Sequence, residues 1–131
     1  MVETKEERIT TMKVCVIDDD YAMGRFAEQF LPNHNITHLR KIPDDVATLS
    51  SFDVLIVDGN GIANKEYANG LDFCKAYTPS GNNRRIVFYS GNGCYHKDLI
   101  DLAARGIVPV TKGSNPDLLK YAVEVGMDDL L

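Results

Sequence analysis

The sequence has 131 residues, the size of one compact domain, so we expect a single domain without an attached output domain. Hydrophobic residues make up 44% and charged residues 25%, values that are typical of a globular protein and argue against a disordered chain. Fourteen Lys and Arg residues against nineteen Asp and Glu residues give a net charge of -5, which disfavours binding to a nucleic-acid backbone.

The sequence predicts neither a membrane span nor a secretory signal. Its longest aliphatic runs, such as Val54–Val57, are far shorter than the roughly 20 residues that cross a bilayer. Residues 1–12 alternate charges without an apolar core, so we interpret them as a flexible tail before a domain at 13–131. The cysteines are odd in number and form no CxxC motif, which is typical of a reduced chain. We therefore expect a cytoplasmic protein with no membrane partner and no nucleic-acid partner.

Short apolar runs predict the strands of a sheet. Four of them are rich in β-branched residues and have the length of strands that are buried on both faces. These runs are Val14–Ile17, Val54–Val57, Ile86–Tyr89 and Ile107–Val110. A fifth and more polar run, Ile36–Ile42, is typical of a strand at the edge of a sheet.

The segments between these runs predict helices. Ala22, Phe26 and Phe30 recur every fourth residue after the first strand and form an apolar helical stripe. Asp20 is the expected N-cap of this helix. Short helices are also predicted at 44–50 and 70–77.

The last two predicted helices follow the fourth and fifth strands. The expected apolar stripe of the first of them consists of Leu99, Ile100, Ala103 and Ala104. The final helix has the strongest start signal, with Asn115 as N-cap and Pro116 in the first turn. Its expected apolar positions are Leu118, Leu119, Ala122, Val123 and Met127.

Five strands alternate with five helices in this prediction. Strict alternation is typical of a parallel sheet with right-handed crossovers. We therefore predict the α/β fold class: a doubly wound, flavodoxin-like (βα)5 three-layer sandwich with strand order 2-1-3-4-5. Ligands of such folds bind in the crevice beyond the carboxyl ends of the strands.

Polar residues end four of the predicted strands. They are Asp18, Asp19 and Asp20 after the first strand, Asp58 after the third, Ser90 after the fourth and Lys112 after the fifth. Because the carboxyl ends of parallel strands meet at one edge, we expect these groups to converge. Two carboxylates about 5 Å apart repel by roughly 3 kcal/mol at an effective dielectric constant near 20, so such a cluster requires cations. Lys112 supplies one charge, and Mg²⁺ suits the carboxylate oxygens.

In this order and context the residues resemble the response-regulator receiver domain of two-component signalling. The resemblance covers about residues 12–126. By position it implies that Asp58 is the phosphoacceptor, that Ser90 contacts the phosphoryl group, and that Lys112 pairs with it. The metal ligands that it implies for Mg²⁺ are Asp18, Asp19, Asp58 and the backbone carbonyl of Asn60.

The function that this resemblance implies is phosphoryl acceptance by a stand-alone receiver. The donor would be a sensor histidine kinase or a histidine phosphotransfer protein, and the phosphorylated domain would signal by altered binding to a downstream protein target. Such a domain is not an enzyme in the usual sense, because it catalyses only its own phosphorylation and dephosphorylation.

Three features depart from the pattern of this family. The loop at 59–69 is enlarged and lacks the usual Met-Pro pair. Lys112 is followed by Gly113 where the family generally has a proline in a cis bond, so we predict a trans bond here. Pro109 stands where the family often has an aromatic switch residue.

Two other functions fit the same residues. The first is a haloacid-dehalogenase-like phosphatase, in which Asp18 and Asp20 would form the DxD motif. Against this function, Asp58 would then be idle, and Ala22 stands where that family prefers Thr or Val. The second is a scaffold that keeps the receiver fold without being phosphorylated.

Overall fold

The computed structural model describes residues 11–91 and 96–125. Its elements, in chain order, are β1 (Lys13–Ile17), α1 (Tyr21–Phe30), β2 (Asn35–Leu39), the 3-10 helix η2 (Val46–Ser51), β3 (Val54–Val57), α2 (Gly70–Ala76), β4 (Arg85–Ser90), α3 (His96–Ala104), β5 (Val108–Thr111) and α4 (Pro116–Glu124). The five strands form one parallel sheet in the order β2-β1-β3-β4-β5. The predicted α/β fold and strand order are confirmed.

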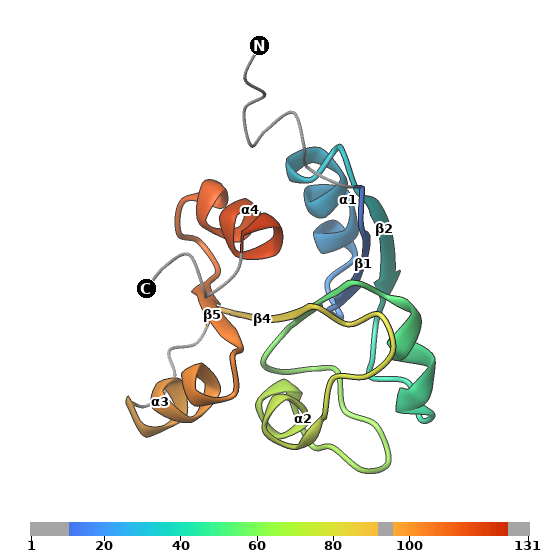
Figure 1. The fold of residues 1–131 in the computed structure, drawn as a ribbon, viewed down its shortest axis with the longest axis vertical. Helices are drawn as coiled ribbons and strands as arrows, with labels where there is room; N and C mark the ends of the chain where they lie inside the picture. Colours follow the sequence, from blue (N-terminus) through green and yellow to red (C-terminus); the bar gives the residue numbers. More distant parts are fainter. Residues whose placement is uncertain (1–10, 92–95, 126–131) are drawn as a thin grey trace.

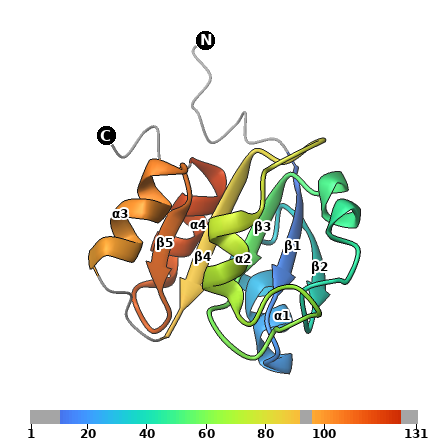
Figure 2. The same ribbon diagram turned by 90° about the horizontal axis from the view of Figure 1, so that it is seen from below.

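Helices cover both faces of the sheet and complete a three-layer sandwich (Figure 1). Helices α1 and α4 pack on one face, whereas η2, α2 and α3 pack on the other. Figure 2 shows the second face, with α2 and α3 in front of the strands. Because the strands are parallel, their carboxyl ends all lie at the same edge of the sheet.

Strand β3 illustrates why these sequences form buried strands. Its four residues are all buried, and successive side chains point to opposite faces of the sheet. Val54 and Ile56 lie in the apolar cluster beneath α1 and α4, whereas Leu55 and Val57 lie in the cluster beneath α2 and α3. A strand that is apolar on both faces fits only the interior of such a sandwich.

Two elements after β1 differ from the prediction. Strand β2 ends at Leu39 because its pairing with β1 stops at that residue. Ile42 is buried outside the sheet, where its N–H donates to the carbonyl oxygen of Ile62 at 2.9 Å. The helix expected at 44–50 is the 3-10 helix η2, for which Asp45 is the N-cap. Such helices are common as short connectors.

The predicted apolar stripes of α3 and α4 are partly wrong. Ile100 is 68% exposed and Leu118 is 54% exposed, and Ala103 and Ala104 are exposed as well. Both helices lie at the β5 edge of the sheet, which leaves part of each apolar face uncovered. The predicted position Met127 lies outside the described residues.

A buried acid takes a core position in α3. Asp98 is 5% exposed, and its Oδ1 accepts a hydrogen bond from Nζ of Lys75 in α2 at 2.5 Å. This ion pair raises the pKa of Lys75. The ion pair therefore allows an acid to be buried between α2 and α3.

The long connection at 59–69 is anchored along its length. The N–H of Gly70 donates to the carbonyl oxygen of Gly59 at 2.9 Å and closes the ends of the loop. Nδ2 of Asn64 donates to the carbonyl oxygen of Pro43 at 3.0 Å, and the Ile62 side chain is fully buried. The loop is therefore compact and packs against the segment after β2.

A search of the described helices finds none that is long and apolar enough to span a membrane.

Candidate functional site

Three carboxylates meet at the carboxyl edge of the sheet. Asp18 follows β1, Asp19 is its neighbour and Asp58 follows β3, and each offers an oxygen within 4.8 Å of the others. Asp18 is buried, Asp58 is half-buried and Asp19 is exposed. The convergence expected from the ends of parallel strands is therefore present. Three carboxylate oxygens this close together fit the donor set of a hard divalent cation such as Mg²⁺.

Lys112, which follows β5, bridges two of these acids. Its Nζ donates to Oδ2 of Asp18 at 2.6 Å and to Oδ1 of Asp58 at 3.0 Å. Burial lowers the pKa of Lys112, but the hydrogen bonds to Asp18 and Asp58 outweigh it and the pKa is raised overall. The ammonium group is therefore held charged between the two carboxylates.

One ammonium group does not neutralise three acids. Burial raises the pKa of Asp58; the hydrogen bond from Lys112 opposes this effect and the charge of Asp18 adds to it. The N–H of Gly59 also donates to Oδ1 of Asp58 at 2.8 Å. The net result is a carboxylate whose ionised form is still disfavoured. A second cation at this edge would lower that cost.

The segment after β5 brings Lys112 to the site through a trans bond. The described residues contain no cis peptide bond, which confirms the prediction for Lys112 and Gly113. The backbone N–H of Lys112 donates to the carbonyl oxygen of Ser90 at 3.0 Å, and the chain turns at Gly113, where φ is 85°. The β4–β5 ladder therefore extends to the lysine itself.

Ser90 lies beside the residue that follows Asp58. Its side chain is buried, and a Cβ atom placed on Gly59 would lie only 2.6 Å from the Ser90 Oγ. A side chain at position 59 would therefore push the hydroxyl group away. The structure brings Ser90 to the same edge as Asp58 and Lys112. Asn60 is exposed two residues after Asp58.

Gly61 allows the loop after β3 to pass close to Asp19. Its φ is 81°, a conformation that favours glycine, and a Cβ atom there would lie 2.3 Å from Oδ2 of Asp19. The compact loop therefore forms one wall of the acidic cluster. This contact depends on the fold and could not be read from the sequence.

Asp20 has a structural role rather than a place in the cluster. Its Oδ1 accepts a hydrogen bond from the backbone N–H of Ala22 at 2.9 Å, as expected of the N-cap of α1. The acids that converge with Asp58 are Asp18 and Asp19. This arrangement disfavours the phosphatase alternative, which needs Asp18 and Asp20 as partners and leaves Asp58 idle.

An exposed pair of side chains lies beside this edge. Arg40 follows β2 directly, its guanidinium carbon is 3.9 Å from the centre of the Tyr21 ring, and its Nη1 donates to the Tyr21 hydroxyl at 2.6 Å. Tyr21 is the first residue of α1. The stacked pair was not predicted from the sequence, because the two residues belong to elements that only the parallel pairing of β1 and β2 brings together.

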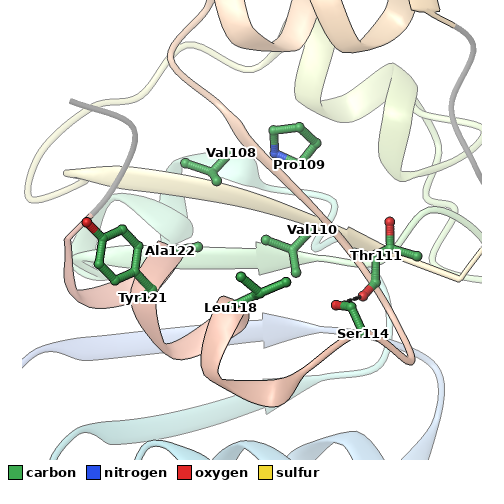
Figure 3. A pocket seen from close by; sticks show the side chains of 8 residues that line it. All are labelled: Val108, Pro109, Val110, Thr111, Ser114, Leu118, Tyr121 and Ala122. Carbon is green, nitrogen blue, oxygen red and sulfur yellow. Dashed lines mark hydrogen bonds between the residues drawn. The ribbon is translucent and has the colours of Figure 1, made fainter. Parts of the chain in front are cut away.

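A groove of about 250 Å³ lies between β5 and α4 (Figure 3). Its walls include Pro109 and Val110 from the strand and Leu118 and Tyr121 from the helix. Figure 3 shows these side chains around the open space at the edge of the sheet. The polar side chains of its lining are the hydroxyl groups of Thr111, Ser114 and Tyr121.

The structure can be compared with those of known proteins. No protein-family model matches the sequence, and no curated protein matches it. The Francisella response regulator 1452 receiver domain is 21% identical, with a TM-score of 0.68 over 88% of this chain and 95% of that one. The BeF3-activated N-terminal receiver domain of Klebsiella pneumoniae RstA is 14% identical, with a TM-score of 0.66 over 87% of this chain and 97% of that one.

A third structure covers a larger share of this chain. It is a response regulator protein from Burkholderia pseudomallei, solved with a phosphorylated aspartic acid, a calcium ion and citrate. It is 16% identical, with a TM-score of 0.66 over 90% of this chain and 69% of that one. Together these structures show that the chain has the receiver-domain fold, as the sequence motifs predict.

Proposed function

We propose that this domain accepts a phosphoryl group on Asp58 in a Mg²⁺-dependent reaction. The observation that carries the proposal is the acidic cluster at the carboxyl edge, where three carboxylates converge and Lys112 bonds to two of them. A site with unbalanced negative charge suits a divalent cation and a phosphoryl group bound together. The receiver-domain fold supports the same conclusion, since a protein with this fold carries a phosphorylated aspartic acid.

In the proposed reaction, a carboxylate oxygen of Asp58 attacks the phosphorus atom of a phosphohistidine. The new oxygen–phosphorus bond forms as the nitrogen–phosphorus bond breaks, and neutral imidazole leaves because its other ring nitrogen already carries a proton in the phosphohistidine. Lys112, which already bonds to Asp58, would pair with a phosphoryl oxygen, and the Ser90 hydroxyl would donate to another. Positioning and charge account for most of the rate in such transfers.

The acids in the cluster would have a different role. Asp18, Asp19, Asp58 and the carbonyl of Asn60 would hold Mg²⁺, which when bound neutralises the charge of the phosphoryl oxygens. Asp18 is fixed by its bond to Lys112, whereas Asp19 is exposed and free to approach a cation from the solvent side. The site thus combines one rigid ligand with one adaptable ligand.

The donor and the output of this reaction form the second part of the proposal. The donor would be a sensor histidine kinase or a histidine phosphotransfer protein in the cytoplasm. The phosphorylated domain would act on a downstream protein by altered binding, and the domain would be no enzyme beyond its own phosphorylation and dephosphorylation.

Incubation with acetyl phosphate and Mg²⁺ tests the proposal. We expect the intact mass to increase by one phosphoryl group and peptide mapping to place it on Asp58, with no adduct when EDTA replaces Mg²⁺. Steady hydrolysis of a phosphomonoester without an adduct would support the phosphatase alternative. A protein that neither binds Mg²⁺ nor forms an adduct would support the scaffold alternative.

A further inference from the structure

His38 contacts the acidic cluster from the strand at the edge of the sheet. It lies in β2, opposite Val16 of β1, and its Nε2 is 2.7 Å from the backbone carbonyl oxygen of Asp18. Because a carbonyl oxygen can only accept, Nε2 carries the hydrogen and donates it. The imidazole is half-buried and reaches past the end of the β1 pairing to do so.

The bond from His38 completes the fixation of Asp18. The backbone N–H of Asp18 donates to the carbonyl oxygen of Leu39 at 2.9 Å. Its Oδ1 accepts from the N–H of Asp20 at 2.9 Å, and its Oδ2 accepts from Lys112. Asp18 is 2% exposed, so water has little access to replace a missing donor. Each backbone and side-chain polar group of Asp18 therefore has a protein partner, and His38 supplies the one for the carbonyl.

Helix α1 leaves a space for the imidazole. Gly24 lies in the interior of this helix and is buried, and a Cβ atom there would lie 2.7 Å from Nδ1 and 3.2 Å from Cγ of His38. Glycine is unfavourable inside a helix compared with alanine, so its presence at this position needs a packing reason. The ring of His38 is that reason. Gly24 and the hydrogen bond are two independent observations on the same histidine.

We propose that His38 is a positioning residue for the cation site, acting through Asp18. By holding the backbone of Asp18, it directs the carboxylate of that residue toward Asp19 and Asp58. This inference rests on the proposed function, in which the acidic cluster binds Mg²⁺. Groups that orient metal ligands typically change metal affinity about 10- to 100-fold when they are removed.

The first test measures Mg²⁺ affinity by calorimetry for the wild type, His38→Gln and His38→Leu. The glutamine amide can donate to the Asp18 carbonyl, whereas leucine fills the space without a donor. We expect His38→Leu to bind Mg²⁺ about tenfold more weakly and His38→Gln to stay within about threefold of the wild type. Rescue by glutamine is a result that loss of packing alone would not produce.

His34 provides a matched control at the opposite end of the sheet. Its imidazole is buried, and it bonds to the Met12 N–H and to Glu124 rather than to the acidic cluster. His34→Leu should reduce the thermal stability of the protein while leaving Mg²⁺ affinity unchanged for the molecules that remain folded. Equal loss of affinity in the two leucine variants would overturn the proposal.

Gly24→Ala tests the same contact from the helix. The added methyl group displaces the imidazole, so we expect Mg²⁺ affinity to fall in the wild-type background. In the His38→Leu background the donor is already absent, and Gly24→Ala should cause little further loss. This non-additivity measures the coupling between the two residues. Gly24→Ala alone, measured in the wild-type background, keeps the proposal testable if His38→Leu fails to fold.

Two failures can be distinguished. A folded wild-type protein that binds no Mg²⁺ would contradict the proposed function. Normal wild-type binding with unchanged affinity in folded His38→Leu, or in Gly24→Ala, would contradict the role of His38 alone. Failure of His38→Gln to restore the affinity would also overturn it.

Discussion

Charged side chains lie at both ends of the sheet, but their partners differ. At the amino end, the Asp53 Oδ2 accepts from the Lys13 N–H at 2.8 Å and the Arg85 Nη1 donates to the Val123 carbonyl at 2.5 Å. Each of these charged side chains bonds to a neutral backbone group. At the carboxyl end, three acids converge, and Lys112 bonds to Asp18 and Asp58.

His34, at the amino end, also has a partner for each of its ring nitrogens. Nδ1 of His34 accepts from the N–H of Met12 at 3.1 Å, so Nε2 carries the hydrogen and donates to Oε2 of Glu124 at 2.9 Å. This chain of bonds connects the start of β1 with the last turn of α4. Each of these hydrogen-bonding groups therefore has a partner within the protein.

We expect polar groups at the amino end to contribute to stability and those at the carboxyl end to contribute to ligand binding. Matched polar pairs hold elements together, whereas an unmatched cluster of like charges costs free energy unless a ligand supplies the missing charge. Substitutions at the amino end should therefore change the stability of the protein. Substitutions at the carboxyl end should change ligand binding and phosphorylation.

The largest expected effect follows from comparing one acid at each end. Asp58→Asn should abolish covalent phosphorylation by acetyl phosphate, because an amide is nearly isosteric with the carboxylate but is a poor nucleophile. Asp53→Asn keeps an oxygen that can accept from the Lys13 N–H, and we expect it to be phosphorylated like the wild type. Intact-mass spectra of both variants after incubation with acetyl phosphate show whether a phosphoryl group has been added. A phosphoryl adduct on Asp58→Asn would contradict the assignment of the phosphoacceptor.

Lys112→Met removes the only cation that bonds to the cluster among the described residues. Asp18 stays buried without its partner, so we expect a loss of about 2 kcal/mol in the free energy of unfolding, less than for a fully buried pair because Lys112 is partly exposed. Mg²⁺ can replace the lost charge. It should therefore raise the urea midpoint of the variant more than that of the wild type. Equal shifts would show that Mg²⁺ binds elsewhere.

Glu124→Ala tests the amino end. The variant leaves Nε2 of His34 without an acceptor in a buried position, which should cost about 1 to 3 kcal/mol in the free energy of unfolding. Glu124→Gln retains an acceptor oxygen and should lose less than half as much. The rate of phosphorylation by acetyl phosphate should remain that of the wild type. A slower rate in folded Glu124→Gln would mean that the two ends are coupled.

Asp19→Asn and Asp20→Asn compare two adjacent acids, only one of which belongs to the cluster. Asp19→Asn removes a ligand charge, so Mg²⁺ affinity should fall about tenfold, which corresponds to about 1.4 kcal/mol. Asp20→Asn keeps an N-cap for α1, because asparagine caps as well as aspartate does, and should change the affinity little. Calorimetric titration with Mg²⁺ measures the affinity of both variants. A larger loss of Mg²⁺ affinity in Asp20→Asn than in Asp19→Asn would assign Asp20 to the metal site.

Residues that act at strand ends could be predicted from the sequence. Asp18, Asp58 and Lys112 each follow a strand, and the geometry of a parallel sheet alone brings such residues together. Ser90 was predicted on the same basis. The fold and the composition of the cluster therefore follow from local patterns combined with one rule of topology.

Contacts across elements could not be predicted in the same way. The bond from His38 to Asp18, and the approach of Gly61 to Asp19, depend on register and loop path rather than on any local pattern. The exposure of Ile100 and Leu118 was missed for a related reason. Helical periodicity identifies an apolar face, but the width of the sheet beneath it decides how much of that face is covered.

Backbone NMR of the wild-type protein with Mg²⁺ and beryllium fluoride tests the central claim most directly, because the trifluoroberyllate group imitates a phosphoryl group on aspartate. We predict that the largest shifts occur at the carboxyl edge, around Asp18, Asp58, Ser90 and Lys112. The amino end, around Met12, His34 and Glu124, should be almost unchanged. Shifts that are largest at the amino end, or no shifts at all in the presence of both reagents, would contradict the assignment of this edge as the phosphorylation site.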